Sequence, residues 1–354
     1  MKITRLTLKN FRSFALAELS FPEGTTVLAG VNGAGKTNIL EAIALLSNGR
    51  SFRASTDNIL AKIPDTHYFV RGSLSGASGL NDTVEISYHA RVKRVAVNGK
   101  ELHARKELIG KFPAVLFLPG DTALVDGEPR LRRDFMSMCA ANADASYLAA
   151  AVDYHRVLKN RNVCLRVQSA DSALYDDGLA SIGYGIIEKN RHFAALLADS
   201  MNAYYREMFS HDNAYRIVYE DGSGSPVSAD EMKKHLSDAS EREKRMKTTL
   251  IGPQRGEYRI YIGEREARHA ASTGEKRLCA VIMNIARHSV IRDAVKEPPM
   301  LLIDDALLEL DKERRARVLE SLTGRGQIII TVTDAALVVP HIGGSVIDVA
   351  SLGA

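Results

Sequence analysis

Tryptophan is absent from this 354-residue sequence, and cysteine occurs only three times. Cys139, Cys164 and Cys279 lie far apart and form no C-x-x-C pair, so neither a disulfide framework nor a zinc site is indicated. No apolar run approaches the length of a membrane span, and the charged stretch MKITRLTLKNFRSF offers no signal-peptide core. The sequence therefore predicts a cytoplasmic protein with no membrane partner.

An excess of one charge is also lacking, because 47 Lys and Arg face 43 Asp and Glu. The net charge of +4 permits nucleic-acid binding without requiring it, so local basic clusters matter more than the total. Hydrophobic residues make up 45% and charged residues 25%, which is ordinary for a soluble globular protein. A chain of this length can form two domains or one large one.

The clearest motif is a phosphate-binding loop, GVNGAGKT, which fits the pattern of Gly, four residues and Gly-Lys-Thr. A short apolar strand over 25–29 precedes it, and apolar residues at helical spacing follow it over 38–46. In this context backbone N–H groups and a helix N-terminus cradle phosphates. We expect Lys36 to reach the β- and γ-phosphates of ATP and Thr37 to bind Mg²⁺. The residues expected to hold the nucleotide are Gly30, Val31, Asn32, Gly33, Ala34, Gly35, Lys36 and Thr37.

Two acidic residues follow a second apolar strand, Met300 to Ile303. Asp304 would hold Mg²⁺ through water, which is the usual task of the first acid after such a strand. Asp305 would orient or deprotonate the water that attacks the γ-phosphate. The alternative is a strand that ends in a solvated acidic turn, and the phosphate loop upstream argues against it.

The stretch ASTGEKR, residues 271–277, begins a long helix. Ser272 and Glu275 have the spacing of a capping box, which is a structural role. Gly274 in the first helical turn costs about 1 kcal/mol relative to alanine, which indicates that something approaches the backbone closely. A serine hydroxyl, free N–H groups and the helix dipole together favour an anion. The stretch therefore predicts both a helix cap and an anion contact.

Strand and helix patterns divide the chain into three segments. Alternating residues predict strands near 1–8 and 15–21 and between 68 and 97, after which Asn98-Gly99 marks a hairpin turn. Helical spacing dominates from 121 to 208 and in the charged run 230–247. Later elements are expected at 250–253 paired with 258–262, and at 273–290, 300–303, 312–322 and 328–332. We predict an α/β head formed by 1–120 and 248–354, with a helical insertion domain, 121–247, between its two parts.

These motifs, together with KNFRSF, GRSFR, FLPGDTALVDGEPRLRRDF, LKNRN, TLIGPQR and LLIDDALLELD, resemble the ABC-type ATPase heads of the SMC family from end to end. The resemblance implies an SMC/Rad50-like P-loop head with an antiparallel sheet, which binds ATP and Mg²⁺ and pairs with a second copy. Ser272 and Gly274 of one copy would contact the γ-phosphate held by the other. Arg12 would contact phosphate or the adenosine region, and residues 309–311 would cross the dimer seam.

Within the family, the motifs resemble a branch that acts in recombinational repair and replication restart. That branch implies a weak, DNA-stimulated ATPase that binds duplex DNA or a duplex–single-strand junction, preferably at single-strand gaps. It also implies an ATP-dependent homodimer, RecR and RecO as partner proteins, and slow hydrolysis as the release switch. Leu308, Gln254 and Gly256 depart from the family pattern, and Asp334 lies near where other ABC heads place a phosphate-sensing histidine.

Four basic clusters are candidates for contact with the DNA backbone, although solvated surface charge is the simpler interpretation of each. They are Arg91, Lys93 and Arg94; Arg130, Arg132 and Arg133; Arg156, Lys159 and Arg166; and Lys244, Arg245 and Lys247. The absence of tryptophan argues against base stacking.

Two other functions stay open from the sequence. A metabolic P-loop kinase or NTPase would use the same phosphate loop but has no use for the Ser272 signature, and ATP-dependent dimerisation would distinguish it. A static DNA binder with a vestigial ATP site would not need Lys36, Asp304 and Asp305, and its DNA affinity would not respond to substitution of Lys36.

Overall fold

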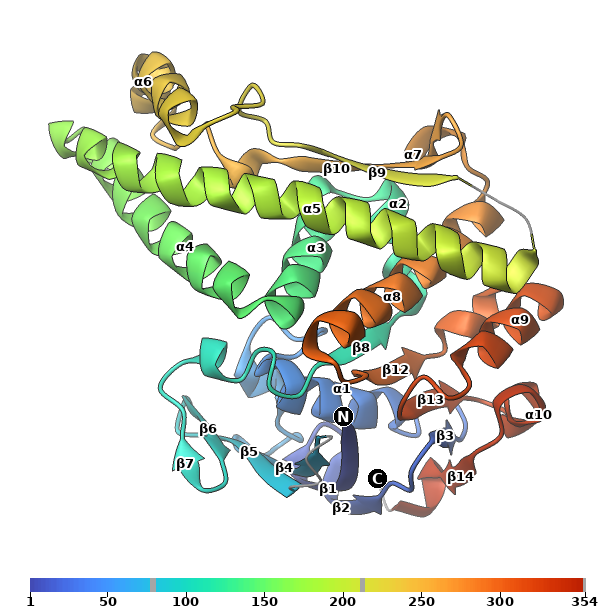
Figure 1. The fold of residues 1–354 in the computed structure, drawn as a ribbon. Helices are drawn as coiled ribbons and strands as arrows, with labels where there is room; N and C mark the ends of the chain where they lie inside the picture. The colour runs from blue at the N-terminus through green and yellow to red at the C-terminus, as the bar shows by residue number, and fades with distance from the viewer. Residues whose placement is uncertain (77–80, 211–213, 353–354) are drawn as a thin grey trace. The chain divides into compact units, whose positions relative to one another are not determined.

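The computed structural model describes residues 1–76, 81–210 and 214–352. The chain divides into two compact units (Figure 1). Unit 1 consists of Met1–Thr122, Tyr204–His211 and Arg277–Ala354, and unit 2 of Ala123–Ala203 and Asp212–Lys276. This division by compactness differs from the expected domain limits at 120 and 247, which followed changes of sequence texture and remain a prediction. Among the described residues, no helix is both long and apolar enough to cross a membrane.

An antiparallel sheet of six strands forms one layer of unit 1, in the order β2-β1-β4-β5-β6-β7. Ile3, Leu6 and Leu8 of β1 are buried, as the alternating pattern predicts. The expected hairpin turn at Asn98-Gly99 is confirmed, because it joins β6 to β7. The strands are β1 Lys2–Phe11, β2 Phe14–Ser20, β4 Tyr68–Ser75, β5 Asn81–His89, β6 Val92–Val97 and β7 Lys100–Glu101.

A parallel sheet of five strands forms the second layer of unit 1, in the order β14-β3-β13-β12-β8. Strands β12 and β13 are buried along their whole length, which is typical of parallel strands covered on both faces. The strands are β3 Thr25–Ala29, β8 Ala114–Phe117, β12 Met300–Asp304, β13 Ile328–Val332 and β14 Ser345–Asp348. Because these strands run in one direction, the loops that follow β3, β12 and β13 meet at one edge of the sheet.

Helix α1, Lys36–Asn48, lies between the two sheets and fills the core of unit 1 (Figure 1). Its buried leucines share one apolar cluster with residues of β1 and β4 on one side and of β12 on the other. A Cβ atom at Gly72 of β4 would come within 2.5 Å of Leu46 Cδ1, so glycine allows the helix to approach the antiparallel sheet. Helices α9, Lys312–Leu322, and α10, Val339–Ile342, also belong to unit 1.

Unit 2 combines helices with a small antiparallel sheet of order β11-β10-β9. Its elements are α2 Ala123–Asp126, α3 Pro129–Ala143, α4 Ala145–Arg166, α6 Ala229–Met246, α7 Ala267–Ala270, β9 Tyr215–Glu220, β10 Glu257–Ile262 and β11 Arg265–Glu266. Two long helices contribute residues to both units: α5, Asp176–Phe209, and α8, Thr273–Val295. The expected helical content of 121–208 and 230–247 is confirmed.

One expectation about unit 2 is wrong. The hairpin between 250–253 and 258–262 does not form, because β10 pairs with β9, with Ile260 opposite Ile217. A 3₁₀ turn that begins at Pro253 occupies the place of the expected first strand, and proline has no N–H with which to pair. Strand β9 was not expected, although its sequence YRIVYE alternates as a half-buried strand does.

Candidate nucleotide-binding site

The phosphate loop joins β3 to α1, as the sequence predicts. Gly35 precedes the first residue of α1 and has a left-handed backbone, with φ of 98°. A Cβ atom at this position would lie 2.7 Å from Phe14 Cζ and 2.9 Å from Ser13 Oγ, so conformation and space both require glycine. Glycine at this position thus lets the N-terminus of α1 begin directly against the β1–β2 turn.

The Lys36 side chain folds back onto the phosphate loop, and the residue is only 5% exposed. Its Nζ atom donates to the carbonyl oxygens of Gly30 at 2.7 Å and Val31 at 3.2 Å. Beside it is a hollow of about 320 Å³. The hollow is lined by Asn32, Gly33, Gly35, Lys36, Thr37, Asn38, Arg53 and Asp305. The loop therefore presents a fixed cation and backbone N–H groups to a space of ordinary ligand size.

The structure brings Thr37 and Asp304 together from opposite ends of the sequence. The Thr37 hydroxyl donates to Asp304 Oδ1 at 2.8 Å, and the Thr331 hydroxyl donates to the same oxygen at 2.9 Å. Asp304 ends β12 and Thr331 lies in the neighbouring strand β13, with the two residues in register. Both hydroxyls bond to one carboxylate oxygen, so within residues 1–76, 81–210 and 214–352 the other oxygen, Oδ2, is available to a further ligand.

Asp305 follows directly and has a left-handed backbone, with φ of 52°. Its Oδ1 atom is buried and has no hydrogen-bond partner among the residues that the structure describes. Burial raises the pKa of the Asp305 carboxyl above its ordinary value, against the opposing effect of the Lys36 ammonium. A half-buried carboxylate with an unpaired oxygen next to Lys36 is suited to accept a proton from water.

These residues fit a nucleotide with Mg²⁺. The hollow offers a lysine, glycine N–H groups and a helix N-terminus to phosphate oxygens. The hydroxyl of Thr37 and the carboxylate of Asp304 are oxygen donors of the kind that Mg²⁺ prefers, and they lie within hydrogen-bond distance of each other.

Arg12, the proposed contact to phosphate or adenosine, is held by a buried carboxylate. Its Nε and Nη2 atoms donate to the two oxygens of Glu41 at 2.8 and 2.7 Å, and Nη1 donates to the carbonyl of Ile59 at 3.0 Å. Glu41, on α1, is fully buried, whereas the Arg12 side chain is 20% exposed. The bidentate pair therefore fixes the Arg12 plane relative to the helix that carries the phosphate loop.

Arg53 is a site residue that sequence reasoning did not single out. It lines the hollow, and its Nη1 atom donates to Asn38 Oδ1 at 3.3 Å. Ser51, two residues earlier, donates to Glu41 Oε1 at 2.5 Å and accepts the N–H of Arg53 at 2.9 Å. The stretch GRSFR, 49–53, is one of the motifs that carry the family resemblance, but the resemblance assigned no role to its last arginine.

The signature stretch forms the capping box that the sequence predicts. Ser272 Oγ accepts the N–H of Glu275 at 3.3 Å, and Glu275 Oε2 accepts the N–H of Ser272 at 2.8 Å. Ser272 is exposed, and Gly274 lies in the first turn of α8. Both residues belong to unit 2, whereas the phosphate loop belongs to unit 1.

Three residues at or beside the positions that depart from the family pattern form hydrogen bonds or ion pairs with nearby side chains or backbone. Glu309, beside Leu308, pairs with Arg277 at 3.1 Å. Gln254 Oε1 accepts from the Tyr154 hydroxyl at 2.5 Å. Asp334 is exposed and caps a short turn by accepting the N–H of Ala336 at 2.9 Å.

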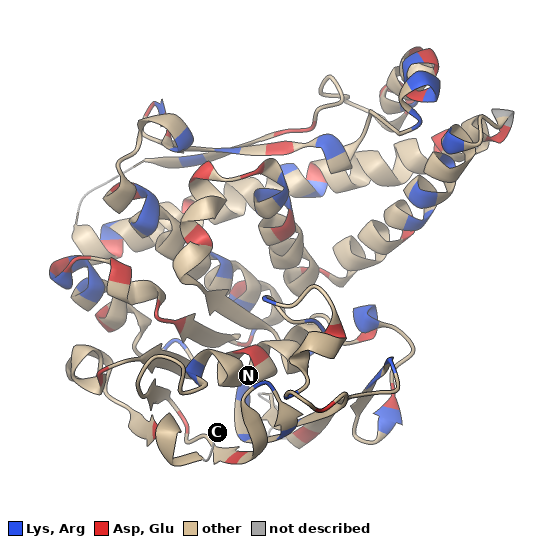
Figure 2. Ribbon diagram, turned by 180° about the vertical axis from the view of Figure 1, so that it is seen from behind, with Lys and Arg blue, Asp and Glu red and all other residues tan. Residues whose placement is uncertain are grey.

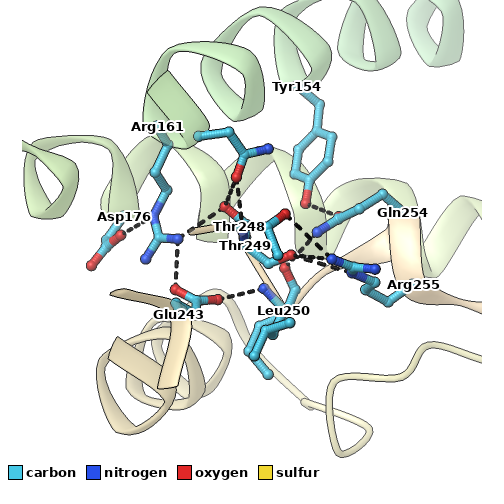
Figure 3. A network of polar contacts seen from close by, with 11 residues as sticks. Tyr154, Arg161, Asp176, Glu243, Thr248, Thr249, Leu250, Gln254 and Arg255 are labelled. Carbon is cyan, nitrogen blue, oxygen red and sulfur yellow. Dashed lines mark hydrogen bonds and ion pairs between the residues drawn. The ribbon is translucent and has the colours of Figure 1, made fainter. Parts of the chain in front are cut away.

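Two stretches singled out in the sequence, LKNRN and TLIGPQR, meet in unit 2 (Figure 3). The buried Arg161 guanidinium donates to Asp176 Oδ1 at 2.8 Å and to Thr249 Oγ1 at 3.0 Å, and its Nη1 lies 2.6 Å from Glu243 Oε2. Glu243, which is fully buried, also accepts the N–H of Leu250 at 2.6 Å. This Arg161 network joins α4, the start of α5, the end of α6 and the segment that follows α6.

In two of the four basic clusters some of the charges have internal partners, whereas Arg91, Arg94 and Arg130 are exposed. Arg132 is buried and pairs with Glu257 at 2.8 Å, and Arg133 donates to the carbonyl of Gly256 at 2.9 Å. Lys93 pairs with Asp57 at 2.6 Å. Figure 2 shows the basic residues interspersed with acidic ones.

The expected exposed stripe on α4 is confirmed for Arg156, Lys159 and Arg166. Exposure of the last cluster, Lys244, Arg245 and Lys247, is confirmed as well.

Comparison with known proteins places these observations in a family. The model of the RecF/RecN/SMC N terminal domain matches residues 2–340. The DNA replication and repair protein RecF of Moorella thermoacetica is 33% identical, over 95% of this chain and 91% of that protein. RecF of Caldanaerobacter subterraneus subsp. tengcongensis is 29% identical, over 92% of each.

Solved structures agree with the sequence comparison. A structure of the recombination mediator protein RecF-ATPrS in the RecFOR pathway matches with a TM-score of 0.88 and 28% identity, over 99% of this chain and 96% of that one. The Smc head bound to the C-terminal winged-helix domain of ScpA matches with a TM-score of 0.56 and 16% identity, which shows the shared fold alone. With its phosphate loop, paired acids and helical insertion in the expected order, this chain belongs to the RecF/RecN/SMC N-terminal domain family, within its RecF branch of DNA replication and repair proteins.

Proposed function

We propose that this protein is an ATP-switched DNA-binding protein of recombinational repair and replication restart. One observation carries the proposal: Thr37, Asp304 and Asp305 converge beside Lys36 at a hollow of ligand size. The ATP named in solved RecF structures supports the choice of nucleotide. In this proposal ATP closes two copies of the chain around DNA, and slow hydrolysis reopens them.

Each site residue has a defined task in the proposal. The N–H groups of the loop and the Lys36 ammonium bind the β- and γ-phosphates. Thr37 and Asp304 hold Mg²⁺, which neutralises phosphate charge when it is bound. Asp305 orients or deprotonates the attacking water, because its carboxylate lines the hollow beside Lys36. Arg53 supplies positive charge at the rim of the hollow, and Arg12, held by Glu41, is proposed to contact phosphate or the adenosine region.

Pairing of two heads would use surfaces that are exposed in the single chain. Ser272 is exposed at the start of α8, and Val31, at the tip of the phosphate loop, is 73% exposed. In the proposed dimer, Ser272 and Gly274 of one copy contact the γ-phosphate held by the other. ATP thereby gains contacts in the closed dimer that it lacks in the monomer, which is the differential affinity that a switch requires.

The molar mass in solution, measured by light scattering with and without ATP and Mg²⁺, tests this proposal. The wild-type chain is expected to double its mass when ATP is added. Lys36→Met is expected to abolish the shift because ATP binding is lost. Ser272→Arg is expected to abolish it while ATP still binds, because a bulky cation replaces the serine at the seam.

Ser228→Arg is the matched control, since Ser228 caps α6 in the same way by accepting the N–H of Glu231 at 3.1 Å. This variant should dimerise as the wild type does. An unchanged mass for the wild type with ATP bound would refute the pairing and favour the alternative of a metabolic P-loop enzyme.

DNA binding is proposed to use the exposed stripe of Arg156, Lys159 and Arg166 on α4. If the dimer neutralises about six phosphates, the log–log slope of affinity against salt should be about −5. Replacing the three residues with alanine should reduce that slope by about 3 per chain engaged, because each contact contributes about 0.9. Filter binding to gapped duplex between 50 and 200 mM salt would measure it, with Lys312→Ala on α9 as a control outside the stripe. An unchanged slope would exclude the stripe.

The RecFOR pathway named for the related structures supports RecR and RecO as partners. The proposed DNA target is a duplex or a duplex–single-strand junction, because backbone contacts by arginine and lysine do not require stacking on the bases. The preference for single-strand gaps rests on the family resemblance.

A further inference from the structure

Thr331 is a polar residue in an otherwise apolar, fully buried strand. Strand β13 reads IIITV, and the Thr331 side chain is completely inaccessible. A buried hydroxyl is unfavourable unless it is hydrogen-bonded. Valine has the same shape and suits a buried strand at least as well. Strand formation therefore does not explain why this position holds threonine. The hydrogen bonds of its hydroxyl do.

The hydroxyl of Thr331 bonds to both acids of the site. It donates to Asp304 Oδ1 at 2.9 Å and accepts the backbone N–H of Asp305 at 3.0 Å. The carbonyl of Ile303, at 3.5 Å, is a weaker alternative acceptor for its proton. One side chain on the neighbouring strand thus fixes the carboxylate of the first acid and the backbone of the second.

The bond to Asp305 matters because of the backbone there. Its φ of 52° is uncommon for a residue other than glycine and persists only where the surroundings hold it. With this turn, the Asp305 side chain lines the same hollow as Lys36 and Thr37. An extended backbone would direct the side chain elsewhere, since reversing φ changes the direction of the Cα–Cβ bond.

We propose that Thr331 is a positioning residue for ATP hydrolysis, which holds Asp305 in the left-handed turn that directs its carboxylate into the hollow while it fixes Asp304. This inference rests on the proposed function, because it assumes that ATP is the substrate. Thr331 itself need not touch the nucleotide. It affects hydrolysis by positioning Asp304 and Asp305.

Thr331→Val is expected to lower single-turnover ATP hydrolysis by about 10- to 100-fold, the usual effect of removing a group that orients a site residue. ATP affinity should change less than about twofold, because the loop and Lys36 are untouched and Asp304 keeps its hydrogen bond to Thr37. Thr331→Ser should restore hydrolysis, since it keeps the hydroxyl.

Thr26 provides the matched control. It lies in β3, opposite Ile329 of β13, is completely buried, and its hydroxyl has no partner within the described part of the chain. Thr26→Val should leave the hydrolysis rate unchanged. Both valine variants should keep the melting temperature within about 4 °C of wild type.

Hydrolysis by Thr331→Val at the wild-type rate would overturn the inference, as would a loss that serine does not rescue. Those results are distinct from a wild-type chain that hydrolyses no ATP, which would instead refute the proposed function.

Discussion

Asp305→Asn is expected to stop ATP hydrolysis while the ATP-dependent dimer remains. Asparagine has the size of aspartate but cannot accept a proton from water, and loss of a general base lowers rates by about 10²–10⁴-fold. The binding groups stay in place, because the ammonium of Lys36 bonds to the loop and Asp304 is held by Thr37 and Thr331. Removing one negative charge beside the phosphates should, if anything, strengthen ATP binding.

Single-turnover hydrolysis and light scattering on the same samples would measure both effects. In the wild type the dimer should decay as ATP is consumed, and in Asp305→Asn it should persist. Asp304→Asn is the contrasting variant, because it removes the carboxylate proposed for Mg²⁺ and should weaken binding as well as hydrolysis. An Asp305→Asn dimer that decays at the wild-type rate would contradict the role of Asp305.

The pH dependence of hydrolysis follows from the environment of the same residue. Burial raises the pKa of Asp305, so the base is protonated up to a higher pH than an ordinary aspartate would be. The rate should therefore rise with pH through this raised pKa and level off above it. The acid limb should be absent from the residual activity of Asp305→Asn.

Arg161→Met is expected to lower the stability of unit 2 much more than a substitution of an exposed arginine on the same helix. Arg161 is 2% exposed and faces Glu243, which is fully buried, and Asp176. Removing the guanidinium leaves the Glu243 charge buried without its partner, which costs about 3–5 kcal/mol in comparable cases. The loss should appear as faster hydrogen exchange of the amides of α4 and α6, and as a lower urea midpoint for unit 2.

Arg156→Met is the matched control, because Arg156 lies on the same helix and pairs with Asp153 at 3.0 Å in an exposed position. Such a surface pair contributes at most about 1 kcal/mol. The double variant Arg161→Met/Glu243→Gln should recover part of the loss by removing the buried charge. Equal effects of Arg161→Met and Arg156→Met would show that the network adds little to stability.

The sequence predicts the local geometry of the candidate nucleotide site where that geometry depends on spacing along the chain. The phosphate loop and the paired acids each lie within a few residues between a strand and a helix, so their geometry follows from the elements that flank them. The capping box at Ser272 is confirmed for the same reason.

Features that depend on distant partners could not be predicted in this way. Arg12 is fixed by Glu41, which lies 29 positions later, and Thr331 reaches Asp304 across 27 positions. Arg132 belongs to a basic run that looks exposed in sequence, yet it is buried against Glu257, 125 positions away. In each case the pairing is set by the packing of elements, and nothing in the residues nearby specifies the partner.

The cap at Ser272 also determines which hydrogen-bonding groups of that serine remain available to a further partner. A hydroxyl has one proton and two lone pairs. The cap uses a lone pair, because Ser272 Oγ accepts the N–H of Glu275, while the reciprocal bond engages the serine's own backbone N–H. The hydroxyl proton is not used by the cap. The helix thus keeps the oxygen in one orientation in the single chain. If Ser272 donates to the γ-phosphate of a second copy, as proposed, its side chain has little rotational freedom left to lose.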